Sequence, residues 1–413
     1  MRVIAMPAPK QVRFVAAAML AVALLFVALN FAKQHGGITP FGPELGADYP
    51  AFFIAGQVLN STPERLHDLA LQEKLYHQLI PDAPAGQFLF YPSAPFLAII
   101  FRPLALLPYA WSYLAWLAIG AVVAMAAYWL MWKASPGLAG GDWLTVMLAA
   151  FSFTPFLLEG WIGGQPSALT VFCAALAIYL RQRGHKFSAG MALATLAFKP
   201  TLMLLLVPML LITRSFRVLS GVIAGGLGLL ALSVWAVGCE GCMRFLRYLV
   251  VYAQVERANP EALRSWKYVD LRSAAYPIFH HPSLWSSVVL AVLIIAGATL
   301  LWRTWRHSTD WRLAWATALI WTPVLSPHCA IYDTALLIPA VILVAPTQKT
   351  SDWFLPLVAL VYVTAWCSQP IAAVAGFQPL SATIILLGLY LCRCQAAALV
   401  PTGATSLSVE ARI

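Results

Sequence analysis

Uncharged apolar runs alternate with short polar links along most of the chain. The first run, residues 14–32, is long enough to cross the roughly 30 Å hydrocarbon core of a bilayer as one helix. Further apolar runs follow at 109–132, 143–158, 166–180, 187–213, 218–237, 284–302, 311–325, 329–344, 353–367 and 379–391. This pattern predicts an all-α polytopic membrane protein.

Composition and charge placement support a membrane environment. The 413 residues are 61% hydrophobic and only 10% charged, whereas soluble domains are usually about 25% charged. The formal net charge is +10, and the basic residues lie in the links between apolar runs. This distribution follows the positive-inside rule and does not indicate a nucleic-acid partner. The alternation of links predicts about twelve transmembrane helices, with both termini cytoplasmic and residues 1–413 forming one membrane domain.

Two external loops are predicted, of which the first, residues 33–108, is the more complex. Its acidic part contains an amphipathic stretch, 63–79, that predicts a helix on the membrane surface. Residues 88–107 are apolar but are interrupted by three prolines and Arg102. If this stretch spanned the membrane, the later basic links would lie outside. Charge alternation therefore favours a re-entrant or interfacial segment, with a span as the alternative. The second external loop is predicted at 238–283, and a cytoplasmic tail at 395–413.

The run 187–213 differs from the others because Lys199 and Pro200 interrupt it. Both of its flanks are basic, so it has to enter and leave on the cytoplasmic side. We therefore expect two short helices that meet at Lys199 near the outer face, since proline interrupts a helix.

Seven cysteines are present, and none has the spacing of a metal site. The sequence therefore predicts neither a metal nor a cofactor. Cys239 and Cys242 lie close together in the second external loop, where they could pair or remain free thiols.

The predicted topology gathers polar residues at the external side. They are Asp48, Glu159, Gln165, Lys199, His328, Tyr332 and Asp333. A charged group at this depth is costly to desolvate, so it requires a partner, a proton to exchange or water. Glu159 is the weakest candidate, because a carboxylate at a helix end is commonly solvated.

Each of these residues also has a purely structural interpretation. Asp48 could cap a helix that begins at Tyr49 or Pro50. Lys199 could extend its ammonium to the interface, and His328 could be an ordinary loop histidine. In the same way, residues 163–166 could be only a tight turn, and Tyr332 with Asp333 a buried hydrogen-bonded pair.

Several short motifs resemble glycosyltransferase family 87, which groups polytopic enzymes of the C superfamily. The motifs are Gly46-Ala47-Asp48-Tyr49 with Ala55-Gly56, Phe90-Tyr91-Pro92-Ser93-Ala94-Pro95 with Arg102-Pro103-Leu104, Gly163-Gly164-Gln165, Ala189-Gly190 with Phe198-Lys199-Pro200, and Ser326-Pro327-His328 with Tyr332-Asp333. Their order and spacing carry the resemblance, which extends from the first external loop to about the tenth predicted span. Ser93 is a departure, because a second proline is expected there.

The resemblance implies a fold and a reaction. The fold would be a C-superfamily bundle, and the enzyme would transfer a hexose, with mannose most typical, from a polyprenyl phosphate donor to a glycan or glycolipid acceptor. It would invert the anomeric centre at the outer face of a bacterial plasma (inner) membrane. In such families an acidic residue of the first external loop acts as general base, which here would be Asp48. Lys199 and His328, assisted by Arg102, would bind the donor phosphate.

The remaining candidates would contact the sugar or acceptor, or support residues that do. They are Tyr49, Glu159, Gln165, Tyr332 and Asp333, and Asp333 would orient His328 or Tyr332. A nucleotide-sugar enzyme would be expected to carry an Asp-x-Asp metal site, and the sequence has no such triplet. Two other classes stay open: a transporter or flippase of a lipid-linked sugar, and a non-catalytic assembly factor. The sequence shows no inverted repeat, the feature that would favour a transporter.

Overall fold

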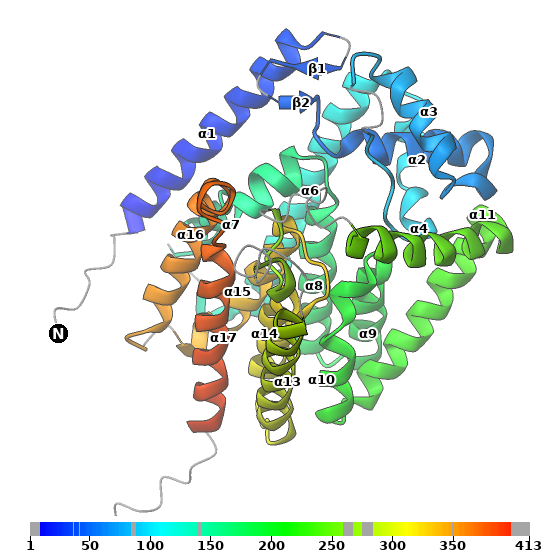
Figure 1. Cartoon of the computed structure of the whole chain (residues 1–413). Coiled ribbons are helices and arrows are strands. Elements are labelled where there is room, and N and C mark those ends of the chain that lie inside the picture. Colours follow the sequence, from blue (N-terminus) through cyan, green and yellow to red (C-terminus); the bar gives the residue numbers. More distant parts are fainter. Residues whose placement is uncertain are drawn as a thin grey trace, which may run out of the picture.

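The computed structural model describes residues 9–35, 37–40, 42–83, 88–138, 142–258, 267–274, 284–348 and 351–397. The described chain is almost entirely helical, apart from a two-stranded antiparallel hairpin (Figure 1). Its first elements are α1 (Pro9–Lys33), β1 (Ile38–Thr39), β2 (Gly42–Glu44), α2 (Tyr49–Ser61), η1 (Pro63–Arg65), α3 (Leu69–Leu79), α4 (Pro95–Ala98), α5 (Phe101–Leu104) and α6 (Tyr109–Ala134). The middle elements are η2 (Pro136–Leu138), α7 (Asp142–Phe151), η3 (Pro155–Ile162), α8 (Ser167–Gln182), α9 (Lys186–Ala194), η4 (Thr195–Phe198), η5 (Pro200–Met203), α10 (Leu206–Ile212) and α11 (Phe216–Ala258). The last are α13 (Leu284–Arg306), α14 (Trp311–Leu325), η7 (Ile331–Leu336), α15 (Leu337–Gln348), α16 (Phe354–Ala375) and α17 (Pro379–Ala397).

The predicted all-α membrane architecture is confirmed, although the number of spans is not. Six helices of the described chain are long and apolar enough to cross a membrane, or seven if α7 and η3 form one span bent by 55°. Several other predicted runs form shorter helices, because proline or an irregular turn interrupts them. The count of twelve therefore stays a prediction.

The centre of the bundle is formed by α14 and α15, with the other helices around them (Figure 1). Every residue from Leu313 to Leu325 on α14 is buried. In the apolar segment Ile331–Gln348, which covers η7 and α15, 67% of the residues are buried. By contrast, only 11% to 17% of the residues in the most apolar stretches of α1, α11 and α13 are buried. These three helices present apolar side chains outward, which is expected where lipid takes the place of a protein neighbour.

The helix break at Lys199 is where the proline pattern predicts it. Lys199 has an extended backbone (φ −121°, ψ 99°) between the short helices η4 and η5, and α9 and α10 continue on either side. Pro200 begins η5, a first-turn position that its missing N–H does not disturb. The break frees Lys199 from the helical ladder and leaves its side chain inside the bundle, with 13% exposed.

Two facing glycines allow α9 and α11 to cross with their backbones in contact. A Cβ atom at Gly190 would lie 1.9 Å from the carbonyl oxygen of Val218, and one at Gly221 would lie 2.0 Å from that of Phe187. Only glycine fits at such distances, as at other close helix crossings in membranes. The crossing fixes the direction in which α9 leads to Lys199.

The second external loop is partly helical. α11 continues to Ala258 beyond a sharp kink at Gly238, whose φ of 70° is left-handed. Cys239 and Cys242 lie just after this kink and are free thiols. Within the rest of the predicted loop, 267–274 is described, whereas 259–266 and 275–283 are outside the described residues. Most of the predicted tail, 398–413, is also outside them, and α17 covers its first three residues.

Residues 88–108 contain no helix long enough to span a membrane. Only the four-residue helices α4 and α5 form there, among the prolines. Asn60 at the end of α2 binds this segment by donating from Nδ2 to the carbonyl oxygen of Arg102 at 3.0 Å. The segment therefore packs on α2 (Figure 1).

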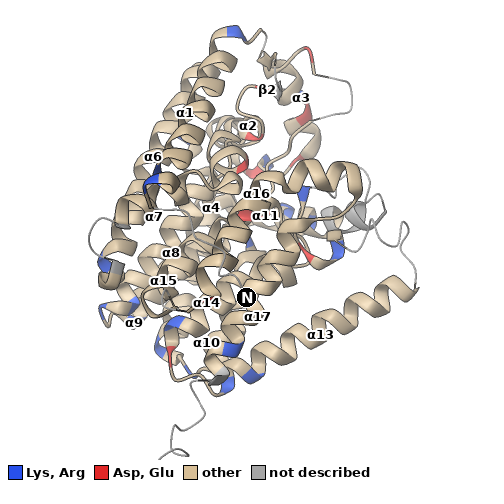
Figure 2. Cartoon of the chain, turned by 90° about the vertical axis from the view of Figure 1, so that its left-hand side faces the viewer, with Lys and Arg blue, Asp and Glu red and all other residues tan. Residues whose placement is uncertain are grey.

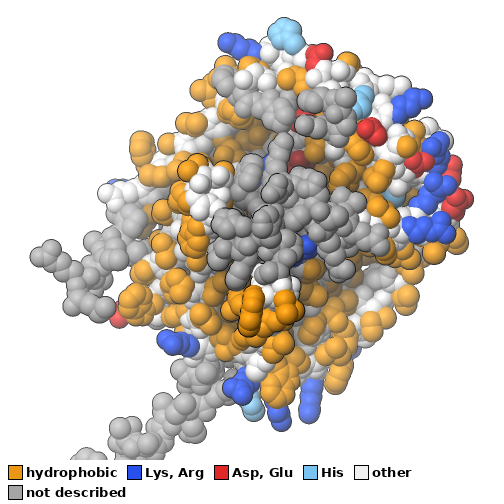
Figure 3. Space-filling view, in the orientation of Figure 1, with side chains coloured by type: hydrophobic (Ala, Val, Ile, Leu, Met, Phe, Trp, Pro, Cys, Tyr) orange, Lys and Arg blue, Asp and Glu red, His pale blue; other side chains and the backbone are white. Residues whose placement is uncertain are grey.

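Charges are distributed unevenly over the molecule. Figure 2 shows a group of Lys and Arg residues near the ends of α9, α10 and α13, with others near α11 and the end of α1, whereas several acidic residues lie toward β2, α2 and α3. Apolar side chains cover much of the region between these ends, as the space-filling view in Figure 3 shows. This is the polarity expected of a bundle whose basic end faces the cytoplasm.

His67 attaches the segment between η1 and α3 to the rest of the bundle. Its ring lies against the rings of Tyr91, Phe245 and Tyr248, with centroids 4.8 to 5.7 Å away. Nε2 donates to the carbonyl oxygen of Ser93 at 3.0 Å, so Nδ1 carries the lone pair, and Nδ1 is buried without a partner. Burial lowers the pKa of His67 to about 4, although the hydrogen bond to Ser93 opposes this shift.

Acidification is expected to destabilise this attachment. Above pH 6.5 His67 is neutral in both folded and unfolded chains. Between pH 6.5 and about 4 only the unfolded chain takes up the proton. The free energy of unfolding therefore decreases by up to about 3 kcal/mol as the pH is lowered through this range. The melting temperature of the detergent-solubilised protein, measured from pH 7 to 4, should therefore fall less steeply in His67→Gln. The exposed His35→Gln is the control, and equal slopes in all three proteins would refute the assignment.

Candidate active site

Asp48 occupies the capping position of α2 but does not cap it. Its side chain accepts no hydrogen bond from the first turn of α2. Instead Gln165 Nε2 donates to Asp48 Oδ2 at 2.7 Å, and the Asp48 backbone N–H donates to the carbonyl oxygen of Gly163 at 3.0 Å. The capping interpretation of Asp48 is therefore wrong. The carboxylate is half-buried and is held by a residue 117 positions away.

The Gly163-Gly164-Gln165 turn is a docking contact between two distant loops. Gly164 has φ +79°, and a Cβ atom there would lie 2.5 Å from Tyr49 Cβ and 2.8 Å from the carbonyl oxygen of Gly46. Gly46 itself has φ +80°, and Ala47 also has a positive φ. Both loops are thus bent into left-handed conformations that let their backbones meet. The turn supplies the amide that holds Asp48.

Replacing Gly164 by alanine is expected to separate these loops and to reduce activity by more than tenfold. The added methyl group meets a backbone atom that cannot move without displacing Asp48. Gly184→Ala is a matched control, because Gly184 has nearly the same φ, +84°, but open space around it. It should cost only the roughly 1 kcal/mol of left-handed strain. Transfer assays on both purified variants check this, and equal activities would show that the contact is unimportant.

Tyr49 lies behind Asp48 in an aromatic core. It is fully buried, its hydroxyl is 2.6 Å from Ser112 Oγ, and its ring packs on Tyr113 and Trp116. Burial raises the pKa of Tyr49, so it stays a neutral phenol. Its position is that of a supporting residue for Asp48 rather than a contact to substrate.

Lys199, Asp333 and Tyr332 form a second cluster. Lys199 Nζ donates to Asp333 Oδ1 at 2.9 Å and lies 4.0 Å from the centroid of the Tyr332 ring. The two side chains of the ion pair are only 13% and 7% exposed. Asp333 therefore orients Lys199, whereas its orientation of His328 or Tyr332 stays a prediction. The aromatic face and the carboxylate fix the ammonium from two sides.

The Pro-rich segment before α4 packs against the loop that carries Lys199. The backbone N–H of Ala94 donates to the carbonyl oxygen of Phe198 at 3.1 Å, and Tyr91 donates its hydroxyl to the carbonyl oxygen of Ala94. Gln72 Oε1 accepts from the backbone N–H of Tyr91 at 2.7 Å. The first loop thus supports Lys199 as well as Asp48.

His328 is covered by a segment that sequence analysis did not single out. The ring of Tyr268 lies 4.3 Å from that of His328, and Val269 donates its backbone N–H to the carbonyl oxygen of Cys329. Asp270 is fully buried and accepts from the backbone N–H of Cys329 at 3.1 Å. Burial raises the pKa of Asp270, and the hydrogen bonds it accepts and its proximity to His328 oppose this shift. The Lys-Tyr-x-Asp pattern at 267–270 was the only sequence signal for this contact.

The two clusters are joined by η3, which packs against η7. Glu159 on η3 is half-buried and interacts electrostatically with Lys267 and with Asp48. Cys329 lies within electrostatic range of Asp270, Asp333 and Lys199. Electrostatic interactions therefore link Asp48 with Glu159, Glu159 with the 267–270 segment, and Cys329 with both Asp270 and the Lys199 pair.

Arg102 is not part of this set of interacting side chains. Its Nε donates to Asn60 Oδ1 at 3.2 Å, at the opposite end of α2 from Asp48. Twelve residues of helix separate Asp48 from Asn60, which corresponds to about 18 Å. The structure thus groups Asp48, Tyr49 and Gln165 in one cluster and Lys199, Tyr332 and Asp333 in another, and it places Arg102 at the far end of α2 from Asp48. Among the described residues, no three His, Cys, Asp or Glu side chains are arranged to hold a metal ion.

Comparison with known proteins gives one match. The sequence model of Glycosyltransferase family 87 matches residues 88–327, more than half of the chain. The chain belongs to glycosyltransferase family 87. No curated protein and no solved structure matches.

Membership in glycosyltransferase family 87 makes the protein an enzyme that moves a sugar from a donor to an acceptor. With its apolar helices, it is an integral membrane protein. The family match includes Glu159, Gln165 and Lys199. Asp48 precedes the match, and His328, Tyr332 and Asp333 follow it, so the proposed roles of these four residues depend on the geometry above.

Proposed function

We propose that this family 87 enzyme transfers a hexose from a polyprenyl phosphate donor to a glycan or glycolipid acceptor, with inversion and with Asp48 as general base. The observation that carries the proposal is a half-buried carboxylate, Asp48, held by Gln165, together with a buried ammonium, Lys199, held by Asp333, with electrostatic interactions between the regions of the two groups. A displacement with a phosphate leaving group requires a base for the proton of the attacking hydroxyl and a cation for the departing phosphate.

Asp48 is suited to accept a proton. Gln165 Nε2 occupies Oδ2 of the carboxylate, whereas Oδ1 has no hydrogen-bond partner among the described residues. The acceptor hydroxyl would donate its proton to Oδ1 as its oxygen attacks the anomeric carbon. The bond from that carbon to the phosphate oxygen breaks on the opposite side, so a single displacement inverts the configuration.

Lys199 and His328 are placed to receive the leaving phosphate. Lys199 uses one N–H on Asp333 and keeps two further donors, and His328 lies on the loop between α14 and η7. The lipid phosphate is a good leaving group that departs as an anion, so charge-assisted hydrogen bonds can stabilise it without a general acid.

Gln165 is our candidate for a sugar contact beside the base. Its side chain is 6% exposed, Nε2 donates to Asp48, and Oε1 is buried with no hydrogen-bond partner in the described part of the chain. An unpaired buried amide oxygen is costly, so a ligand hydroxyl that donates to it would bind favourably. Glu159 and Tyr332 are both half-buried and are further candidates for contact with the sugar or the acceptor.

The site is proposed to face outward, because the basic links lie at the other end of the bundle (Figure 2). A bacterial plasma membrane with cytoplasmic termini fits this orientation. A prenyl-linked donor suits an enzyme without a soluble domain, since its tail can stay in the bilayer while the phosphate reaches Lys199. Mannose is the sugar that we propose to test first.

A donor comparison tests this proposal. Purified protein in lipid vesicles is given a radiolabelled polyprenyl phosphate mannose or a nucleotide-linked mannose, together with a glycan acceptor. We expect a new glycosidic product from the lipid donor alone. Product from the nucleotide sugar would refute the lipid donor. Movement of labelled lipid across the vesicle without product would indicate a flippase instead.

A further inference from the structure

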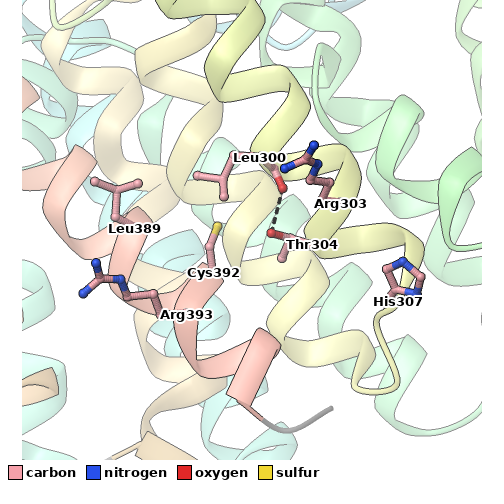
Figure 4. A pocket seen from close by; sticks show the side chains of 7 residues that line it. All are labelled: Leu300, Arg303, Thr304, His307, Leu389, Cys392 and Arg393. Carbon is pink, nitrogen blue, oxygen red and sulfur yellow. Dashed lines mark hydrogen bonds between the residues drawn. The ribbon is translucent and has the colours of Figure 1, made fainter. Parts of the chain in front are cut away.

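A cavity of about 410 Å³ lies between α13 and α17, outside the proposed active site. Figure 4 shows Leu300, Arg303, Thr304 and His307 on the α13 side, and Leu389, Cys392 and Arg393 on the α17 side. The lining of the cavity therefore combines two arginines and a histidine with apolar side chains. An amphipathic anion matches this arrangement.

The described residues provide no ion-pair partner for the cations of this cavity. None of Arg303, His307 and Arg393 forms an ion pair with an acid among the described residues. Thr304 beside them already donates its hydroxyl to the carbonyl oxygen of Leu300 at 2.8 Å. Two guanidinium groups facing one cavity repel each other, so a bound anion would be favourable there.

The helix α13 diverges from the bundle above the cavity, as Figure 2 shows. Its buried residues, Gly297, Leu301 and Trp305, all lie in its second half. Its first residues are exposed, with Leu284 at 79% and Trp285 at 74%. Apolar side chains therefore border the space that leads from the cavity along α13, where an acyl chain would lie.

We propose that this cavity binds an anionic membrane phospholipid. Arg303 and Arg393 would hold the headgroup phosphate from two helices, and the acyl chains would pass Leu300 and Leu389 and follow α13. The cavity lies at the end of the bundle where Lys and Arg gather, so the lipid would come from the leaflet opposite to the proposed active site (Figure 2). Basic sites between helices at this level are typical binding places for anionic lipids.

The test compares two variants that each lose two positive charges from the same end. Arg303→Gln with Arg393→Gln removes the cavity cations. Arg183→Gln with Arg306→Gln is the control, because these arginines lie over the rings of Tyr179 and Trp302 and do not line the cavity. Both proteins are delipidated and titrated with phosphatidylglycerol or phosphatidylcholine, and bound lipid is counted by native mass spectrometry.

We expect the wild type and the control to retain phosphatidylglycerol over phosphatidylcholine, and the cavity variant to bind it at least fivefold more weakly. Leu389→Trp keeps the charges but fills the cavity, and it should also lose the lipid. Equal retention by the cavity and control variants would overturn the proposal. Displacement of the lipid by millimolar inorganic phosphate would also overturn it, because the site would then recognise a soluble anion.

Discussion

Asp48→Asn is expected to reduce transfer by roughly 10² to 10⁴-fold, the usual contribution of a general base. The change removes the proton acceptor and almost nothing else. Because Asp48 makes no capping hydrogen bond to α2, the substitution removes no contact with the first turn of the helix, and an asparagine oxygen can still accept from Gln165 Nε2. The measurement is kcat with a polyprenyl phosphate sugar and a glycan acceptor.

Asp82→Asn is the matched control for this variant. Asp82 is an exposed carboxylate of the same loop, and its loss changes the net charge by the same amount. Its activity should equal that of the wild type. If Asp48→Asn is folded, as judged by its melting temperature, and turns over normally, Asp48 is not the base. A non-catalytic assembly factor would then regain support if both variants restored function in cells.

The apolar pattern predicted most helices well because a bilayer imposes a simple length rule. The run 311–325 coincides with α14, and 14–32 lies inside α1. Deviations occur where local geometry decides. Gly238 has a non-helical backbone (φ 70°, ψ 173°) that divides α11 into two helices, so the predicted run 218–237 ends where the first helix ends, but the second helix up to Ala258 was not predicted. Likewise α16 continues to Ala375, since Pro370 is tolerated within it.

The site was predictable as a set of residues but not as a set of contacts. Motif order pointed to Asp48, Gln165 and Lys199, yet it could not show that Gln165 binds Asp48 or that Lys199 pairs with Asp333. Such contacts join residues more than a hundred positions apart. Asp270 was missed because a single buried carboxylate in a loop has no periodicity. Arg102 contacts Asn60 at the end of α2 that is far from Asp48, and the sequence does not show which end of α2 it meets, so its role at the donor phosphate stays a prediction.

The ion pair of Lys199 with Asp333 makes a simple Lys199 substitution ambiguous. Removing one partner of a buried pair leaves the other uncompensated, which typically costs about 3 to 5 kcal/mol. Lys199→Met should therefore lower the melting temperature whether or not Lys199 binds donor phosphate. The double variant Lys199→Met with Asp333→Asn removes both charges, so it separates stability from function.

We expect the double variant to recover most of the melting temperature but not the donor affinity. A charge-assisted hydrogen bond is worth about 1.5 to 3 kcal/mol, so the KM for the donor should rise by roughly 10 to 150-fold, with the KM for the acceptor unchanged. Asp333→Asn alone keeps the ammonium, so it should affect donor KM far less than loss of Lys199. If the double variant used donor as well as the wild type, the pair would be purely structural. The phosphate would then have to depend on His328, whose contact with Tyr268 places the 267–270 segment next to it.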